Sequence, residues 1–185
     1  RRVMTGLVWG RAAGADLASD AALAALLARA LRAPARNALP DLTYPARKDA
    51  RYGASLAQPV HLEVWEAAHA WLPDHRGPLE AWLAALYAAP VTPQSPNDSW
   101  LHAAGEEPPT ERTRADLSWW ALCTMSPALG APEAPWAPGS ELFPTAGLAM
   151  LRAGDRYASL ECGGQGGGHG HPDRLHLTVH AGGTH

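Results

Sequence analysis

Cysteine, membrane-length apolar runs and clusters of basic residues are scarce or missing in this chain of 185 residues. Its two cysteines, Cys123 and Cys162, cannot form a disulfide framework or a cysteine-rich metal site, so we expect both to be buried thiols. No apolar stretch is long enough to cross a membrane, and residues 1–4 lack the hydrophobic run of a signal peptide. The net charge is only -3 and no basic stripe alternates with aromatic residues, which argues against a nucleic-acid partner.

Hydrophobic residues, in contrast, make up 46% of the chain, which is enough for a folded core. Ser19 or Asp20 is placed to cap a first helix, and Pro34 lies just beyond its expected end. The short segment 73–77 predicts that the second and third helices form a helical hairpin. Apolar residues at helical spacing predict four helices, at residues 17–31, 60–71, 78–89 and 116–125.

Two polar loops of this helical part resemble each other. Residues 39–50 and 93–100 both place proline shortly before a Lys-Asp or Asn-Asp pair. Paired helices with their loops collected at one end are expected in a helical toroid or solenoid. The alternative is that both loops are ordinary connectors, in which Asp49 and Asp98 cap the next element or form Asx-turns.

The pattern changes after residue 126. Residues 127–139 are rich in proline and small residues, which predicts a linker rather than a helix. Alternating apolar and polar residues then predict three strands, at 148–152, 157–162 and 175–179, with turns at Gly154-Asp155 and Gly182-Gly183. We therefore expect a helical domain at 1–126, a linker at 127–139 and the start of a truncated β domain at 140–185.

One loop carries most of the chemical information. Residues 166–173 read Gly-Gly-Gly-His-Gly-His-Pro-Asp and lie between the second and third predicted strands. The glycines remove side chains that would hold a ligand away, and they permit backbone angles closed to other residues. His169 and His171 are thereby presented on an open loop. An imidazole can transfer a proton near neutral pH or bind zinc, and the spacing alone separates neither use from a turn without function.

The run from Leu160 to Leu177, which continues to Ala181-Gly182-Gly183, resembles the signature of the heparinase II/III-like family of polysaccharide lyases. Residues 143–152 resemble the strand that precedes it in that family, and residues 39–52 resemble a loop of the family's helical domain. The resemblance implies an α+β multidomain fold, in which part of an α/α toroid is followed by the first strands of an antiparallel β-sandwich. It also implies an internal fragment that is inactive by itself.

That family cleaves acidic glycans by β-elimination at a uronic acid. The reaction requires a group that neutralises the carboxylate, a base that removes the C5 proton and an acid that protonates the departing oxygen. By resemblance, His169 is the catalytic histidine of the β domain, as base or stabiliser, and His171 is the first ligand of a structural Zn²⁺ ion. The other zinc ligands are expected beyond residue 185, and a catalytic Tyr and an Asn or His before Arg1.

Several further residues are candidate substrate contacts. Arg47, Arg51 and Tyr52 would face the cleft, where arginine offers a bidentate fork to uronate carboxylates. The alternative for this segment is a loop pinned by Arg-Asp pairs. Trp100, in a polar loop, is a candidate for stacking on sugar rings, and Gln165 stands where the family often carries another polar residue or a histidine.

Other tryptophans and histidines have more ordinary interpretations. His176 and His180 share one strand face, where they either line the cleft or meet solvent, and we favour solvent exposure. Four tryptophans at helical spacing are expected in the core: Trp65, Trp82, Trp119 and Trp120.

Two other functions stay open at this point. A toroid and sandwich can lose a catalytic residue and keep the cleft, which leaves a non-catalytic glycan-binding protein. A His-x-His-x-Asp pattern is also compatible with a metal-dependent hydrolase. We expect an acidic polysaccharide or oligosaccharide as partner, and neither nucleic acid nor membrane. The residues do not establish localisation, although a periplasmic or secreted protein is favoured over a cytoplasmic one.

Overall fold

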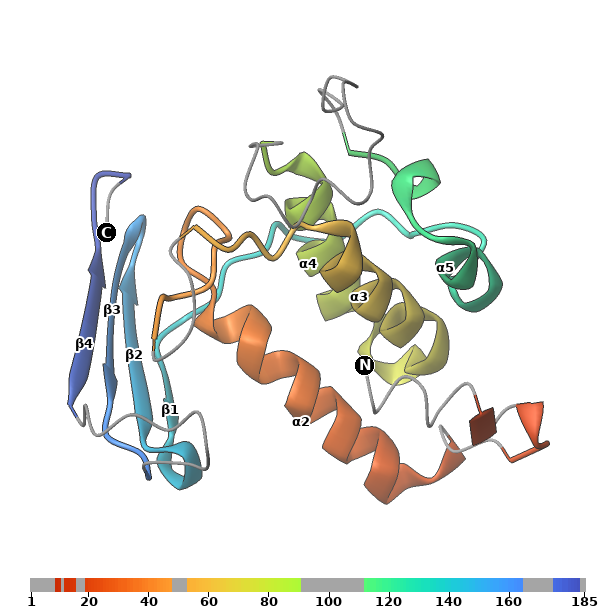
Figure 1. The fold of residues 1–185 in the computed structure, drawn as a ribbon, viewed down its shortest axis with the longest axis horizontal. Helices are drawn as coiled ribbons and strands as arrows, with labels where there is room; N and C mark the ends of the chain where they lie inside the picture. The colour runs from red at the N-terminus through yellow and green to blue at the C-terminus, as the bar shows by residue number, and fades with distance from the viewer. Residues whose placement is uncertain are drawn as a thin grey trace. The chain divides into compact units, whose positions relative to one another are not determined.

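The chain is α+β, with helices and one antiparallel sheet that form two compact units (Figure 1). The computed structural model describes residues 9–10, 12–15, 19–47, 53–90, 112–164 and 175–183. The helical unit comprises residues 1–35 and 57–136, and the sheet unit comprises residues 36–56 and 137–185. Residues 36–56, which the sequence places in a helical domain, thus pack with the sheet.

Helix α2 (Ala21–Asn37) begins where the sequence predicts a cap. The Asp20 carboxylate accepts a hydrogen bond from the Leu23 backbone N–H at 3.0 Å, which is the expected N-cap contact. The predicted end before Pro34 is wrong, because the helix continues through this proline to Asn37. Proline removes one backbone donor from the last turn, while Ala35 and Asn37 in that turn are buried and stabilise it by packing.

Helices α3 (Pro59–Trp71) and α4 (Arg76–Ala88) pack against each other and confirm the predicted hairpin. A short 3₁₀ turn, η2 (Pro73–His75), joins them. Trp65 and Trp82 meet edge to face with ring centroids 5.8 Å apart, and the Trp136 ring packs on Trp82 at a tilt, with centroids 5.0 Å apart. The neighbouring Leu62, Leu83 and Leu86 are fully buried, and a buried leucine contributes about 2 kcal/mol. The core of the helical unit therefore lies in this hairpin.

Helix α5 (Trp119–Thr124) is shorter than predicted, and a capped 3₁₀ turn, η3 (Arg114–Asp116), precedes it. The helix buries only Ala121 and Thr124. Trp119, at its first residue, is 75% exposed, so the prediction of a core position was wrong for this side chain. Consecutive residues of a helix point about 100° apart, so Trp119 and Trp120 face different directions. A helix of only six residues packs one narrow face on the core and leaves Trp119 outside it. No helix in the described part of the chain is long and apolar enough to cross a membrane.

The sheet unit contains an antiparallel meander of strands in the order β1-β2-β3-β4 (Figure 1). The strands are β1 (Glu141–Phe143), β2 (Leu148–Ala153), β3 (Arg156–Glu161) and β4 (His176–His180). The three predicted strands are confirmed, and β1 is an additional strand that the sequence pattern did not indicate. After β1, the 3₁₀ turn η4 (Pro144–Ala146) ends at Gly147, whose φ of 64° reverses the chain into β2.

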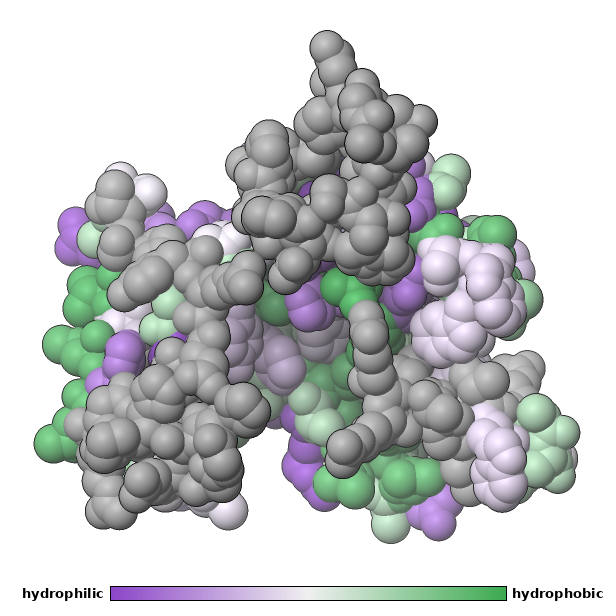
Figure 2. Space-filling view, in the orientation of Figure 1, coloured by the Kyte–Doolittle hydropathy of each residue, from purple (hydrophilic) through white to green (hydrophobic). Residues whose placement is uncertain are grey.

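The two faces of this sheet differ in burial, and the covered face carries both polar and apolar side chains. Ser159 and His180 are each 2% exposed and lie on the same face as Met150 and Tyr157, which pack on Leu39. The expected solvent exposure of His180 was therefore wrong, because residues 36–56 cover this face. Hydrophobic side chains occupy the opposite face and appear along the margin of β4 in Figure 2. The exposed ones are Leu142, Leu151, Leu160, Leu177 and Val179.

Both cysteines are exposed free thiols, which corrects the expectation that they are buried. Cys123 lies on α5, where only Ala121 and Thr124 are buried. Cys162 directly follows the last residue of β3. Helix α5 is too short to pack Cys123 against the core, and Cys162 lies just beyond the end of β3, so both thiols stay exposed.

Candidate functional site

Arg47 is the one predicted site residue that the described part of the chain includes. It is 9% exposed and sits in the segment that covers one face of the sheet. We name its surroundings the Arg47 cluster, which consists of Asn37, Arg47, Tyr157, Ser159 and Glu161. Six other predicted site residues lie outside the described residues: Arg51, Tyr52, Trp100, Gln165, His169 and His171.

Strand β3 supplies three members of the cluster. Tyr157, Ser159 and Glu161 are two residues apart, so they point to the same face of the sheet. Because β2 and β4 flank this strand on both sides, its backbone position is fixed by two ladders. Tyr157 and Ser159 are almost fully buried, whereas the Glu161 side chain is 21% exposed.

The Arg47 guanidinium is held by neutral groups and one carboxylate. Its Nη2 atom donates to Asn37 Oδ1 at 3.1 Å, to Tyr157 OH at 3.0 Å and to Ser159 Oγ. Its Nε atom lies 3.7 Å from Glu161 Oε2. The Tyr157 hydroxyl also donates to Asn37 Oδ1 at 2.8 Å. This geometry favours the pinned-loop interpretation of Arg47, with Glu161 as its carboxylate partner, and direct contact with substrate stays a prediction.

The backbone that carries Arg47 is itself anchored. The Asp41 carboxylate accepts from both the backbone N–H and the hydroxyl of Thr43, which is an Asx-turn arrangement. A β-bridge joins Thr43 to Ser55, and the Tyr44 N–H donates to the Ala54 carbonyl at 2.8 Å. These contacts join residues 43–44 of the covering segment to residues 54–55, which anchors the backbone just before Arg47.

A second arginine fastens β2 to the end of α2. Arg152 Nη2 donates to the carbonyl oxygens of Arg36, at 2.7 Å, and Ala38. Its guanidinium carbon lies 4.7 Å from the centre of the Tyr157 ring, a cation-π contact. Burial lowers the pKa of Arg152. The ring of Tyr157 is thereby fixed by Arg152 while its hydroxyl takes part in the Arg47 cluster.

Gly163, at the start of the glycine-rich run, has a packing role. A side chain on Gly163 would overlap the carbonyl oxygen of Ala146, and one on Gly147 would overlap Gly163. The Cys162 N–H donates to the Gly147 carbonyl at 2.7 Å in the same place. Close backbone approach therefore explains this glycine without a ligand.

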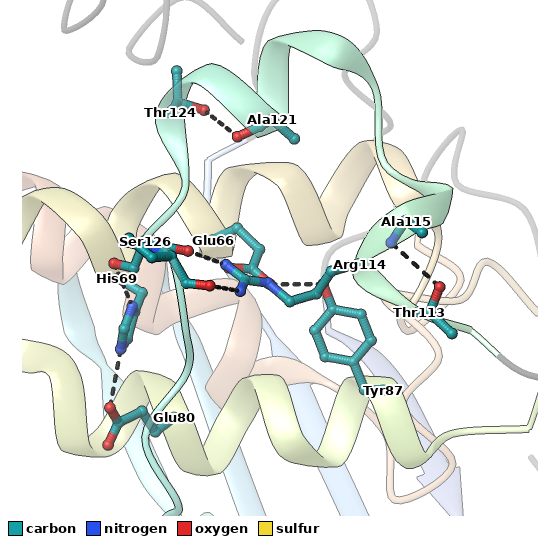
Figure 3. Close-up of polar contacts among 11 residues, drawn as sticks. Glu66, His69, Glu80, Tyr87, Thr113, Arg114, Ala115, Ala121, Thr124 and Ser126 are labelled. Carbon is teal, nitrogen blue, oxygen red and sulfur yellow. Dashed lines mark hydrogen bonds and ion pairs between the residues drawn. The ribbon is translucent and has the colours of Figure 1, made fainter.

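The helical unit contains a separate buried ion pair (Figure 3). Glu66 has no exposed surface, and both of its carboxylate oxygens bind Arg114, at 2.9 and 3.0 Å. The Tyr87 hydroxyl donates to Glu66 Oε1 at 2.7 Å, and burial together with this hydrogen bond raises the pKa of Tyr87. Arg114 also donates to the carbonyls of Ser126 and Pro127. We name Glu66, Tyr87 and Arg114 the Glu66 cluster; it joins α3 and α4 to the chain around α5.

His69 lies between a hydroxyl and a carboxylate in the same unit (Figure 3). Its Nδ1 is 3.0 Å from Ser126 Oγ, and its Nε2 is 3.0 Å from Glu80 Oε1. The hydrogen bond with His69 is the main cause that lowers the pKa of Glu80. A serine hydroxyl, an imidazole and a carboxylate in contact in this order can activate the serine as a nucleophile. Here His69 is only 3% exposed and Glu80 also binds the Gly130 N–H, which favours a role in joining three segments.

Sequence reasoning did not identify four of the five members of the Arg47 cluster. The sequence contained one usable signal: Tyr157, Ser159 and Glu161 are alternate residues of β3 and therefore share one face of the strand, whereas the apolar Leu160 lies on the other face. The Glu66 cluster left no local signal, because Glu66 and Arg114 are 48 positions apart. Within the described ranges, no three His, Cys, Asp or Glu side chains gather as a metal site.

The described residues thus form three polar clusters. The Arg47 cluster lies on the covered face of the sheet, and the Glu66 cluster and the contacts of His69 with Ser126 and Glu80 lie in the helical unit. The predicted glycine-histidine loop connects the strands β3 and β4 in sequence. Comparisons of the chain with protein-family models, with curated proteins and with solved structures give no match. A functional assignment therefore depends on the residues of the chain and their geometry.

Proposed function

We propose that the chain is part of a polysaccharide lyase that cleaves uronic-acid-containing glycans by β-elimination, with His169 as base or stabiliser at the C5 proton. The observation that carries this proposal is the glycine-histidine run between two antiparallel strands, β3 and β4, whose covered face includes polar and charged side chains. An imidazole can take or give a proton near neutral pH, which is what the proposed elimination requires.

In the proposed reaction, His169 takes the C5 proton or stabilises the charge that develops as it leaves. The C4–O bond then breaks, a C4=C5 double bond forms, and an acid protonates the departing glycosidic oxygen. Cationic donors near the uronate carboxylate make the C5 proton more acidic. Arg47, Arg51, Tyr52, Trp100 and Gln165 are the proposed substrate contacts, and the acidic glycan is the proposed partner.

The finer architecture is part of the same proposal. The α3-α4 hairpin supports assignment of the helical unit to an α/α toroid. The apolar outer face of the four-stranded sheet supports a β-sandwich, because a second sheet would cover the exposed leucines. We further propose a periplasmic or secreted location.

His171 is proposed as one ligand of a structural Zn²⁺ ion. Neutral imidazole is a common zinc ligand, and a structural site holds the metal with four groups. One histidine does not hold zinc with useful affinity. The metal would therefore require ligands from elsewhere in the protein, and its role would be to fix the loop that carries His169.

Ultraviolet absorbance of 4,5-unsaturated uronate tests the activity directly. The complete gene product that contains this chain is incubated with a panel of acidic polysaccharides, and wild type is compared with His169→Ala. We expect the substitution to lower kcat by about 10²- to 10⁴-fold, which is the usual contribution of a general base. His75→Ala, at an exposed position of the helical unit, is the matched control and should keep the wild-type rate.

The alternatives give different results in the same assay. Binding of a glycan without any unsaturated product supports a non-catalytic glycan-binding protein. Release of saturated sugar that stops on addition of a chelator supports a metal-dependent hydrolase. An unchanged rate in His169→Ala removes this histidine from the mechanism even if the lyase activity is present.

A further inference from the structure

Ser126, His69 and Glu80 form a continuous series of contacts in the helical unit (Figure 3). The Ser126 hydroxyl oxygen lies 3.0 Å from His69 Nδ1, and Glu80 Oε1 lies 3.0 Å from His69 Nε2. The series therefore has the order hydroxyl, imidazole and carboxylate, and each group is within hydrogen-bond distance of the next. The proposed elimination uses none of these three side chains.

Glu80 determines which nitrogen of the His69 ring carries the proton. The hydrogen bond with His69 lowers the pKa of Glu80, so this carboxyl group is ionised at neutral pH and can only accept hydrogen bonds. The neutral imidazole therefore carries its proton on Nε2, and Nδ1 is left as an acceptor. The Ser126 hydroxyl then donates to Nδ1, which is the direction of proton transfer from a serine to its general base.

Further contacts fix both ends of the series. The Gly130 N–H donates to Glu80 Oε1 at 3.1 Å, and a side chain at residue 130 would overlap this carboxylate. Arg114 donates to the backbone carbonyl of Ser126. The contacts that join these segments thus also hold the hydroxyl against its base. His69 is 3% exposed and Ser126 is only half-buried, so the hydroxyl is the group that a reagent reaches.

We propose that Ser126 is an activated nucleophile that accepts acyl groups from carboxylic esters, with His69 as its base and Glu80 as the group that orients His69. Ser126 Oγ attacks the ester carbonyl carbon while His69 Nδ1 takes the hydroxyl proton. The ester C–O bond breaks, His69 gives the proton to the departing alcohol, and acyl-Ser126 remains. Water then attacks the acyl group with His69 as base, which releases the carboxylic acid and restores Ser126. This activity is separate from the proposed elimination and does not depend on it.

Covalent labelling of the complete gene product tests the nucleophile. A fluorophosphonate transfers its phosphonyl group to an activated serine hydroxyl and releases fluoride, and peptide mass spectrometry locates the label. We expect label at Ser126, and hydrolysis of p-nitrophenyl acetate that is lost in Ser126→Ala. Ser118, an exposed serine directly before α5, is the internal control and should stay unlabelled.

Two substitutions change the carboxylate end of the series without altering Ser126. Glu80→Gln removes the charge that fixes the tautomer of His69, and Gly130→Ala displaces the Glu80 carboxylate. Each should lower the labelling rate at least about tenfold. His69→Gln removes the base and should lower it by about 10²- to 10⁴-fold.

Glu133→Gln is the matched control, because Glu133 is an exposed carboxylate of the same unit, and it should label at the wild-type rate. The urea midpoint of tryptophan fluorescence identifies any variant that fails to fold, and labelling rates are compared among the folded variants only. Glu80→Gln and Gly130→Ala test the same contact by different chemistry, so failure of one variant to fold leaves the other to decide.

Each other outcome overturns one statement. Absence of label at Ser126 in the folded wild-type protein would leave the series a purely structural join. Equal labelling of Ser118 and Ser126 would show that the hydroxyl is not activated. Wild-type labelling rates in both folded carboxylate variants would remove Glu80 from the proposed role. Label at Ser126 without hydrolysis of p-nitrophenyl acetate would overturn the ester reaction.

Discussion

Arg114 in the helical unit and Arg47 in the sheet unit both bind residues that are distant in sequence, but their partners differ in charge. Arg114 makes two hydrogen bonds of 2.9 and 3.0 Å to the fully buried carboxylate of Glu66. Arg47 makes its hydrogen bonds to an amide and two hydroxyls, and its carboxylate partner Glu161 is 3.7 Å away. The Arg114 side chain is 23% exposed and that of Arg47 is 8% exposed.

The two arginines therefore have different structural roles. Glu66 neutralises the charge of Arg114 directly, and removal of either group leaves the other charged and poorly solvated. Several neutral acceptors solvate the Arg47 charge, so its contacts specify the positions of Asn37, the covering segment and β3 within the sheet unit. We therefore expect the Glu66 cluster to matter most for stability and the Arg47 cluster to matter most for geometry.

The distribution of tryptophan makes this comparison measurable. All eight tryptophans lie in the helical unit, at residues 1–35 or 57–136. Tryptophan fluorescence during urea unfolding therefore reports on that unit alone. The sheet unit is followed by hydrogen exchange of its strand amides, which measures local opening.

Glu66→Gln should have the largest effect on stability. The substitution keeps the shape of the side chain but leaves Arg114 without its counter-charge, so we expect a loss of about 3 kcal/mol in unfolding free energy. The urea midpoint by tryptophan fluorescence measures it. Glu133→Gln, at an exposed position of the same unit, is the control. Equal midpoints for the two variants would show that the buried ion pair adds nothing to stability.

Arg47→Met should destabilise the sheet unit by about 2 kcal/mol, the usual contribution of hydrogen bonds to a charged group. Exchange of the β3 amides should accelerate accordingly, while the tryptophan unfolding midpoint stays at the wild-type value. A shift of that midpoint by as much as Glu66→Gln produces would contradict the separation of the two clusters into different units.

The sequence was sufficient where structure depends on neighbouring residues. The α3-α4 hairpin and three of the strands follow from apolar periodicity, and the Asp20 cap follows from the residue type at the start of α2. These features depend on contacts within a few residues. Periodicity identifies them because the repeat of a helix or strand is itself local.

Features that depend on distant partners were not predictable in the same way. Alternation in β4 indicates two faces, but burial of His180 is decided by residues 36–56, which lie far away in sequence. The same applies to the continuation of α2 beyond Pro34 and to the exposure of Trp119. Within the candidate site, Arg47 was identified and its partners were not, because Tyr157 is 110 positions away.

Two tyrosines provide a smaller test of the same comparison. Tyr87→Phe removes a hydroxyl that donates to Glu66, and Tyr157→Phe removes one that joins Asn37 to Arg47. Each loss should cost about 1 kcal/mol. Tryptophan fluorescence should detect only the first, and β3 hydrogen exchange only the second. Detection of both losses by one probe would mean that the two clusters unfold as one cooperative unit.

Glu80→Gln should have the smallest effect, and a specific dependence on pH. The hydrogen bond with His69 lowers the pKa of Glu80 in the folded protein below its usual value of 4.5. The folded state thus binds fewer protons than the unfolded state just below that pH, so this contribution is present above it and is lost as the pH falls through the folded pKa. The urea midpoint of wild type should therefore fall more steeply than that of Glu80→Gln between neutral and acid pH. Parallel curves would show that the His69 contact does not stabilise the ionised carboxylate.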